Sequence, residues 1–134
     1  MADLIQFAIG TAMRREEIAS LEWADLDVDR RAVLIRDRTD PRREEGDHEL
    51  VPLLPVTGYD PPEIIARQPR SGRFIFPYRD ETISTIHARA CAHHGVRIDG
   101  LRFHAYRHEG VSRMFEHGMS TEEVASRSGR RRTG

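Results

Sequence analysis

The stretch "LRFHAYRHEGVSRMFEHG", residues 101–118, restricts the fold more than any other part of the sequence. Apolar side chains recur in it at the spacing of one helical face, and Gly118 follows at a position where helices commonly end. The apolar residues are Phe103, Tyr106, Val111, Met114 and Phe115. We therefore predict a helix that packs on a core along this stripe and closes at Gly118.

Capping residues and the same periodicity predict further helices. "STEEVASRSG" begins with Ser120 as cap, carries Glu123 as its capping-box partner, and ends at Gly129. The other predicted helices occupy residues 2–10, residues 14–21 with Thr11 as cap, part of the proline-rich residues 57–72, and residues 80–95 with Asp80 or Thr82 near the cap and Gly95 at the end. Most of the chain is thus expected to be helical.

Two short apolar runs predict strands. Val33, Leu34 and Ile35 form the centre of the first, and "ELVPLLP", residues 49–55, forms the second. The polar residues between them predict a β-hairpin with a long, arginine-rich tip. Residues 73–78, "RFIFPY", are expected to be a short strand or an extended segment, and residues 97–100 a turn. The expected fold class is mainly α with a small β-hairpin or sheet (α+β), in one domain formed by residues 1–134.

Length and composition agree with one globular domain that has no contact with membranes. Of the 134 residues, 38% are hydrophobic and 32% are charged, which allows a buried core. No apolar run reaches the roughly 18 residues of a membrane helix, and the start "MADLIQFAIG" lacks the basic leader of a signal peptide. The single cysteine, Cys91, cannot form an intramolecular disulfide, which favours a cytoplasmic location.

The basic residues are all arginine, 21 of them, in a chain with a net charge of −1. They cluster at residues 14–15, 36–43 and 130–132, while acidic residues concentrate in "EEIASLEWADLD" and "STEEV". Overall neutrality can therefore hide a basic face. A GC-rich genome is one explanation for the preference for arginine. The other is phosphate binding, because a guanidinium group grips phosphate bidentately.

His104, Arg107 and His108 lie three and four positions apart and share one face of the predicted helix. A solvated polar face is the simpler interpretation. However, the positions four residues before and after Arg107 are occupied by Phe103 and Val111. Arg107 must therefore find an anion outside its own helix, and a phosphate group would meet that need.

Two other features invite the same question. Arg14 lies at the start of a predicted helix, where backbone N–H groups favour anions, and Glu17, one turn later, can orient an arginine beside it. The hairpin tip, "IRDRTDPRREEGDHELVPL", gathers further arginines. Each feature alone also fits an ordinary charged surface.

In this order, the three features resemble the catalytic domain of the tyrosine recombinases, the phage-integrase family. "TAMRREEIASLEWADLD" is similar to the family's first arginine box, T-G-(L/M)-R-x-x-E followed by L-x-W-x-D-(I/L)-D. "VLIRDRTDPRREEGDHELVPL" resembles the β-hairpin after that box. "LRFHAYRHEGVSRMFEHGMSTEEVASRSG" resembles the second box, H-x-x-R-H, and the segment leading to the third.

The resemblance implies site-specific DNA recombination or integration, in which a tyrosine cuts one strand through a 3′-phosphotyrosyl intermediate. It assigns to Arg14 and Arg107 the stabilisation of charge on the scissile phosphate, and to His104 an acid/base or phosphate-contact role. Glu17 would support Arg14, and His108 would have a packing or supporting role. No metal or cofactor is implied.

The resemblance also implies partners. The expected ones are double-stranded DNA and other recombinase protomers. The arginines expected to contact DNA, beyond those of the two boxes, are Arg15, Arg36, Arg38, Arg42 and Arg43.

The sequence departs from the family pattern in its proton donors. The family's hairpin lysine should lie near Thr39, but the chain contains no lysine. Arg38 or Arg42 would be a poor donor, because arginine stays protonated up to a pH of about 12. In the third box Arg130 follows Gly129 where the family usually has histidine, which leaves a supporting phosphate contact but no acid/base function.

The family spacing puts the nucleophilic tyrosine beyond Gly134, since Tyr59, Tyr78 and Tyr106 lie in other segments. The catalytic domain is therefore expected to be incomplete at both ends, truncated before the nucleophile, and unable to cleave DNA alone. One alternative is a non-catalytic DNA-binding remnant, or a regulator of full-length recombinases. Another is a helical domain whose surface arginines are incidental.

Overall fold

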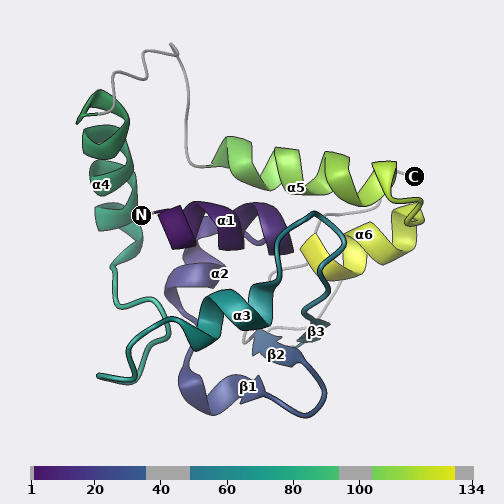
Figure 1. The fold of residues 1–134 in the computed structure, drawn as a ribbon, viewed down its shortest axis with the longest axis horizontal. Coiled ribbons are helices and arrows are strands. Elements are labelled where there is room, and N and C mark those ends of the chain that lie inside the picture. Colours follow the sequence, from purple (N-terminus) through teal and green to yellow (C-terminus); the bar gives the residue numbers. More distant parts are fainter. Residues whose placement is uncertain (1, 36–48, 94–103, 129–134) are drawn as a thin grey trace, which may run out of the picture.

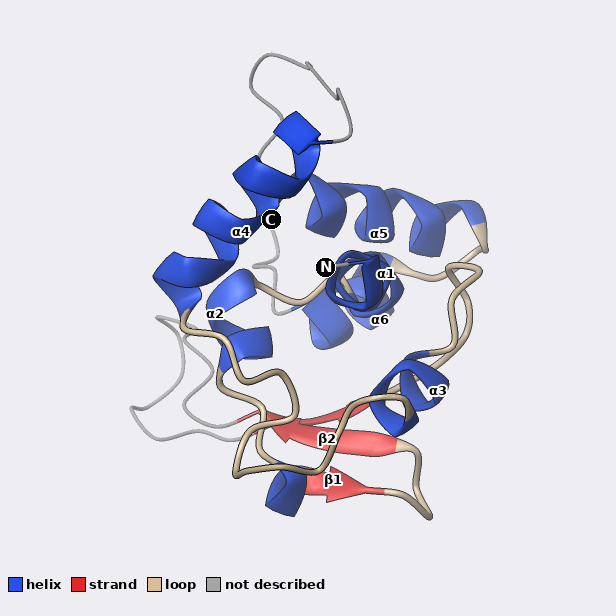
Figure 2. Cartoon of the chain, turned by 60° about the vertical axis from the view of Figure 1, so that its left-hand side comes forward, coloured by secondary structure: helices blue, strands red, loops and turns tan. Residues whose placement is uncertain are grey.

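The computed structural model describes residues 2–35, 49–93 and 104–128 (Figure 1). In chain order their helices and strands are α1 (Ala2–Thr11), α2 (Arg15–Ala19), the 3-10 helix η1 (Trp23–Asp25), β1 (Leu26–Asp27), β2 (Ala32–Ile35), β3 (Glu49–Pro52), α3 (Pro61–Ala66), α4 (Asp80–His93), α5 (His104–Glu116) and α6 (Thr121–Ser128). Helices predominate beside one small sheet (Figure 2), so the predicted fold class is confirmed. None of the helices described is long and apolar enough to cross a membrane.

The sheet is antiparallel, with β2 between β1 and β3. β2 and β3 pair from Ala32 opposite Pro52 to Ile35 opposite Glu49. The two predicted hairpin strands are thereby confirmed, whereas the predicted tip lies outside the described residues. The sequence does not predict η1 or β1, because segments of three and two residues are too short to carry a periodic pattern.

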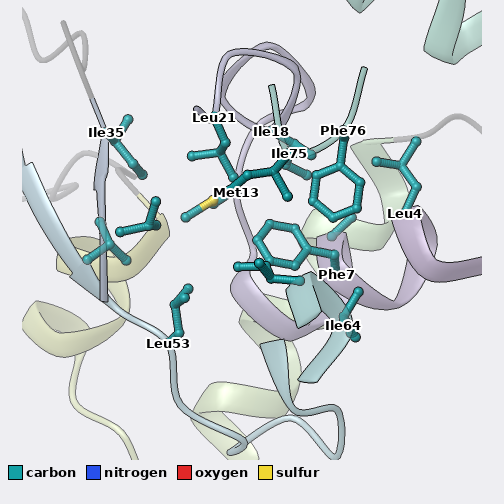
Figure 3. Packing of buried hydrophobic residues seen from close by; sticks show 14 of the residues in the cluster. Leu4, Phe7, Met13, Ile18, Leu21, Ile35, Leu53, Ile64, Ile75 and Phe76 are labelled. Carbon is teal, nitrogen blue, oxygen red and sulfur yellow. The ribbon is translucent and has the colours of Figure 1, made fainter. Parts of the chain in front are cut away.

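The main core is built around α1 and reaches the sheet, α2, α3 and the start of α4. Phe7 of α1 packs against Phe76 with ring centroids 4.9 Å apart, and Figure 3 shows Met13, Ile18 and Leu21 converging on the same region. Burying an aromatic side chain of this size contributes about 3 kcal/mol. With α5 on one side and α3 on the other (Figure 1), α1 is held on several faces.

The last two described helices end and begin as predicted. Gly118 has a φ of 92°, and the backbone N–H of Met119 donates to the carbonyl of Met114 at 3.2 Å, which closes α5. At the start of α6, Ser120 and Glu123 form a reciprocal capping box of 3.1 and 3.2 Å.

The packing stripe of α5 is only partly as predicted. Val111 and Met114 are buried and pack with Val124 of α6 in a second apolar cluster. Phe115 is 46% exposed, so its assignment to the stripe is wrong. Phe103 lies outside the described residues, as does Gly129.

The start of α2 differs from the prediction, whereas the start of α4 and residues 73–78 each agree with one predicted alternative. Thr11 is the last residue of α1 and not the cap of α2, whose cap is Arg14. α4 begins at Asp80, so that Thr82 lies inside the helix, while Gly95 and residues 97–100 fall outside the described residues. Residues 73–78 form a single bridge, between Phe74 and Glu22, which agrees with the predicted alternative of an extended segment.

Candidate phosphate-binding site

The first arginine segment, which contains Arg14, lies on a sharp turn between α1 and α2. The hydroxyl of Thr11 donates to the Phe7 carbonyl at 2.8 Å and accepts the backbone N–H of Met13 at 3.3 Å. Ala12, between them, has a φ of 56°, in the left-handed region that non-glycine residues seldom adopt. The turn therefore ends α1, and Arg14 follows it as the cap of α2.

Glu17 fixes the position of Arg14 through the backbone. Its carboxylate Oε1 accepts the Arg14 N–H at 3.0 Å, and the Glu17 side chain is buried. Only this half of a capping box is chemically possible here, because a guanidinium group cannot accept a hydrogen bond. The predicted supporting residue thus contacts Arg14, although through the main chain.

The second arginine segment, which contains Arg107, lies in the first half of α5. The Arg107 guanidinium donates through Nε to the carbonyl oxygen of Ala12 at 3.1 Å, across 95 residues of sequence. The acceptor is two residues before Arg14. Two arginines that are remote in sequence are therefore held in one region, where α5 crosses the end of α1 (Figure 2).

Gly110 makes this crossing possible. A Cβ atom at that position would overlap the backbone oxygen of Ile9 and would lie 3.2 Å from the Ala12 side chain. Any other residue would force α5 away from α1, and Arg107, three positions earlier on the same helix, would move with it. The glycine is a condition for the contact between the two arginine segments.

The structure also shows the surroundings of two further predicted residues, Arg15 and His108. Arg15 is half-buried, and its guanidinium donates to the hydroxyl of Ser84 on α4. His108 is exposed on α5, and its packing or supporting role stays a prediction. His104 is the first residue of α5, and its side chain lies outside what the structure describes.

The remaining predicted site residues also lie outside the described residues. They are Arg36, Arg38, Arg42 and Arg43 of the hairpin tip, and Arg130 of the third box. Their roles stay predictions. Within the described ranges, no three His, Cys, Asp or Glu side chains are grouped so as to hold a metal ion.

A partly buried polar pair next to Arg107 was not predicted. His87 of α4 is 3% exposed, and its Nε2 lies 2.6 Å from the hydroxyl of Tyr106, with the two rings nearly perpendicular at 83°. Burial lowers the pKa of His87 below its ordinary value of 6.5, which favours the neutral imidazole at neutral pH.

Sequence signals for some of these residues exist. A glycine within a strongly periodic helix, such as Gly110, usually has a packing reason. The alanine at position 12 stands where the arginine-box pattern has glycine, and it adopts the backbone conformation that glycine favours. Nothing in the sequence pairs His87 with Tyr106, because that contact depends on how α4 packs against α5.

The three tyrosines of the chain have defined surroundings. The hydroxyl of Tyr106 is bonded to His87. Tyr59 is half-buried, with the Arg113 guanidinium 5.5 Å from its ring centre. Tyr78 is 39% exposed and lies on the segment that leads into α4. None of them follows the α5–α6 segment, after which the family places its nucleophile.

Known proteins match this chain over nearly all of its length. The family model described as "Phage integrase family" matches residues 2–133. The chain belongs to the phage integrase family. A relative within curated sequences, the shufflon-specific DNA recombinase of Escherichia coli, is 30% identical over 96% of this chain, which corresponds to 31% of that recombinase.

Solved structures of integrases share the fold of this phage integrase family member. The Tn1549 transposon integrase in complex with circular intermediate DNA matches with a TM-score of 0.72 and 16% identity, over 98% of this chain and 50% of that one. A lambda integrase tetramer bound to a Holliday junction gives 0.74 and 18%, over 97% and 40%. XerA recombinase gives 0.66 and 12%, over 98% and 52%. The chain thus spans about half the length of these structures or less.

Proposed function

We propose that this chain supplies the phosphate-binding part of a site-specific DNA recombinase. In this proposal residues 1–134 form a single, partial catalytic domain. Double-stranded DNA and other recombinase protomers are its proposed partners. Membership of the phage integrase family supports the reaction class. The single cysteine supports a cytoplasmic location.

One observation carries the proposal: the hydrogen bond from Arg107 Nε to the Ala12 carbonyl. It joins the two arginine boxes next to Arg14, the N-terminal cap of α2. When an oxygen nucleophile attacks a phosphodiester, negative charge accumulates on the non-bridging oxygens of phosphorus. Two guanidinium groups held at one place can neutralise that charge in the transition state more than in the ground state, which lowers the barrier.

The proton transfers need other groups. In the proposed reaction a tyrosine oxygen bonds to phosphorus, the bond to the 5′-oxygen breaks, and that oxygen takes up a proton to leave as a hydroxyl group. His104 is proposed for an acid/base or phosphate-contact role, and Arg130 for a phosphate contact. Arg15 and the arginines of the hairpin tip, residues 36–43, are proposed to bind the DNA backbone. The family resemblance supports these roles.

None of Tyr59, Tyr78 and Tyr106 is the proposed nucleophile. Tyr106 holds α4 against α5 through His87, and Tyr59 is covered by Arg113. We therefore expect this polypeptide, incubated with a nicked suicide DNA substrate, to form no covalent adduct on these side chains. Peptide mapping of an adduct to any of the three would overturn this part of the proposal.

The phosphate-binding role is tested by arginine substitution. Arg14→Ala and Arg107→Ala should each weaken binding to a short DNA duplex about tenfold. Each should also reduce the slope of log K against log salt by about 0.9, the amount for one lost phosphate contact. Arg67→Ala is the matched control, because Arg67 pairs with Asp3 on the face formed by α1 and α3. Unchanged affinity and slope in both site variants would overturn the role.

A further inference from the structure

One face of α4 contacts both arginine segments. Ser84 and His87 are three positions apart and share this face. The Ser84 hydroxyl accepts a hydrogen bond from the Arg15 guanidinium, and His87 Nε2 is 2.6 Å from the Tyr106 hydroxyl. Figures 1 and 2 show α4 standing beside α2, against which it packs.

The residues that bond to Ser84 and His87 are the chain neighbours of the two proposed phosphate-binding arginines. Arg15 follows Arg14, and Tyr106 precedes Arg107. On the opposite side, Arg107 of α5 donates a hydrogen bond to the Ala12 carbonyl and so connects the two arginine segments directly. α2, α4 and α5 are thus tied to one another by polar contacts that all lie within two residues of the two arginines.

The character of the contacts matters for what they do. Apolar packing would hold α4 against α5 while tolerating small rotations of α5 about its own axis. A hydrogen bond of 2.6 Å between two side chains of defined ring orientation, 83° apart, tolerates much less. Because Tyr106 and Arg107 are consecutive on the helix, the rotation that the bond fixes also sets the direction in which the Arg107 side chain leaves α5.

The burial of the pair strengthens this constraint. His87 is 3% exposed and Tyr106 is half-buried, so that little water is available to replace a broken bond. In these contacts α2 presents Arg15 to α4, and α5 presents Tyr106, which is partly buried against the main apolar core. α4 therefore meets the arginine segments with directed polar contacts.

We propose that His87, assisted by Ser84, is a positioning residue for phosphate binding: it orients Arg107 through Tyr106, as Ser84 restrains the segment of Arg14 through Arg15. Neither residue touches the phosphate. The inference rests on the proposed function, because it presupposes that Arg14 and Arg107 bind a phosphate of DNA. No motif of the arginine boxes includes either residue.

The experiment measures duplex-DNA binding by the 134-residue chain over a range of salt concentrations, with thermal unfolding of each variant in parallel. His87→Leu removes the bond to Tyr106 and keeps an apolar side chain in the buried position. We expect it to weaken binding about tenfold and to reduce the salt slope by about 0.9, since one phosphate contact is lost. His87→Gln, whose amide can still bond to the Tyr106 hydroxyl, should recover most of the affinity and the slope.

Controls separate positioning from folding. His117→Leu, at an exposed histidine beyond the end of α5, should bind DNA as the unsubstituted chain does. Ser84→Ala should weaken binding less than His87→Leu, because Arg14 is also held by Glu17. A partly unfolded variant would bind less DNA with an unchanged slope, because the remaining folded molecules make the full set of contacts. An affinity loss with an unchanged slope would therefore overturn the inference in favour of a purely structural role.

The outcome also distinguishes the inference from the proposed function. If Arg107→Ala loses affinity and slope but His87→Leu has neither effect, the positioning role is wrong and the phosphate-binding role stands. If Arg14→Ala and Arg107→Ala themselves change nothing, the proposed function is wrong and the positioning role fails with it. Tyr106→Phe should reproduce the effect of His87→Leu, because it removes the same bond from the other side.

Discussion

The two arginine segments reach the same place by different physical means. Arg14 is the cap of a five-residue helix, and its position depends on main-chain contacts: the Thr11 hydroxyl, the turn at Ala12 and the Glu17 carboxylate. Arg107 lies within a helix of 13 residues, and its position depends on where that helix packs. The first segment is held mainly by local contacts, to which α4 adds the bond between Arg15 and Ser84, and the second is held by its tertiary contacts.

This difference determines which substitutions affect which arginine. Changes at the turn should move Arg14 and leave most of α5 in place. Changes at the crossing of α5 over α1 should move Arg107 and cost more stability, because they disturb a large packed surface.

The largest effect is expected for Gly110→Ala. Alanine would favour the helix by about 1 kcal/mol, but overlap with the Ile9 backbone should cost about 3 kcal/mol or more, because neither backbone can yield. We therefore expect a net loss of about 2 kcal/mol in the free energy of unfolding, measured by urea denaturation. Gly72→Ala, at a position with no heavy atom within 4 Å of the added Cβ, is the control and should be close to neutral.

Thr11→Val tests the turn that carries Arg14. Valine has nearly the same shape but cannot accept the backbone N–H of Met13, which would be left in a buried environment. The expected loss is about 1.5 kcal/mol in the free energy of unfolding. Thr11→Ser keeps the hydroxyl and should lose less. Equal losses in both variants would contradict the role of the hydroxyl.

Glu17→Ala should cost about 1 kcal/mol, since it removes the acceptor for the Arg14 N–H. Glu16→Ala, at an exposed position in the first turn of the same helix, removes the same charge and should cost only a few tenths of a kcal/mol.

The DNA affinity of double variants then compares the two segments. Glu17→Ala should have little further effect once Arg14 is alanine, but its full effect when only Arg107 is alanine. Equal further losses in both backgrounds would show that Glu17 does not act through Arg14.

The smallest effect is expected from pH. The pKa of His87 is lowered by burial, so the folded protein takes up this proton at a lower pH than the unfolded chain does. The free energy of unfolding should therefore have its full value above about pH 6.5, the ordinary pKa of histidine, and should decrease as the pH drops below it. Denaturation between pH 7.5 and pH 5 would measure the slope, and His87→Gln should reduce it. The hydrogen bonds with Ser120 lower the pKa of Glu123, so this carboxylate is protonated at a lower pH than the range in which the slope is measured.

Much of this architecture is predictable because it is encoded locally. The capping box of Ser120 and Glu123, the glycine that closes α5, and the apolar run of β2 are properties of a few neighbouring positions. The two-residue β1 is not predictable in this way, since it exists only as a partner of β2.

The residue types of the candidate site follow from the sequence, whereas the geometry that brings them together does not. The pattern around Arg14 and Arg107 indicates that both belong to one site. That Arg107 would bond to a carbonyl of the other box, and that His87 would contact the residue beside it, depends on packing between helices distant in sequence. The error at Phe115 has the same origin, because helical spacing does not reveal how wide a stripe the neighbouring elements cover.

The turn at Ala12 links the two arginines more closely than their separate means of support suggest. Its φ of 56° is a conformation that costs an alanine about 1 kcal/mol, and its carbonyl is the acceptor for Arg107. If this one residue relaxed to an ordinary backbone conformation, its carbonyl would rotate away from α5 and the chain leading to Arg14 would change direction. The backbone torsions of Ala12 therefore set both the direction of the chain at Arg14 and the position of the acceptor for Arg107.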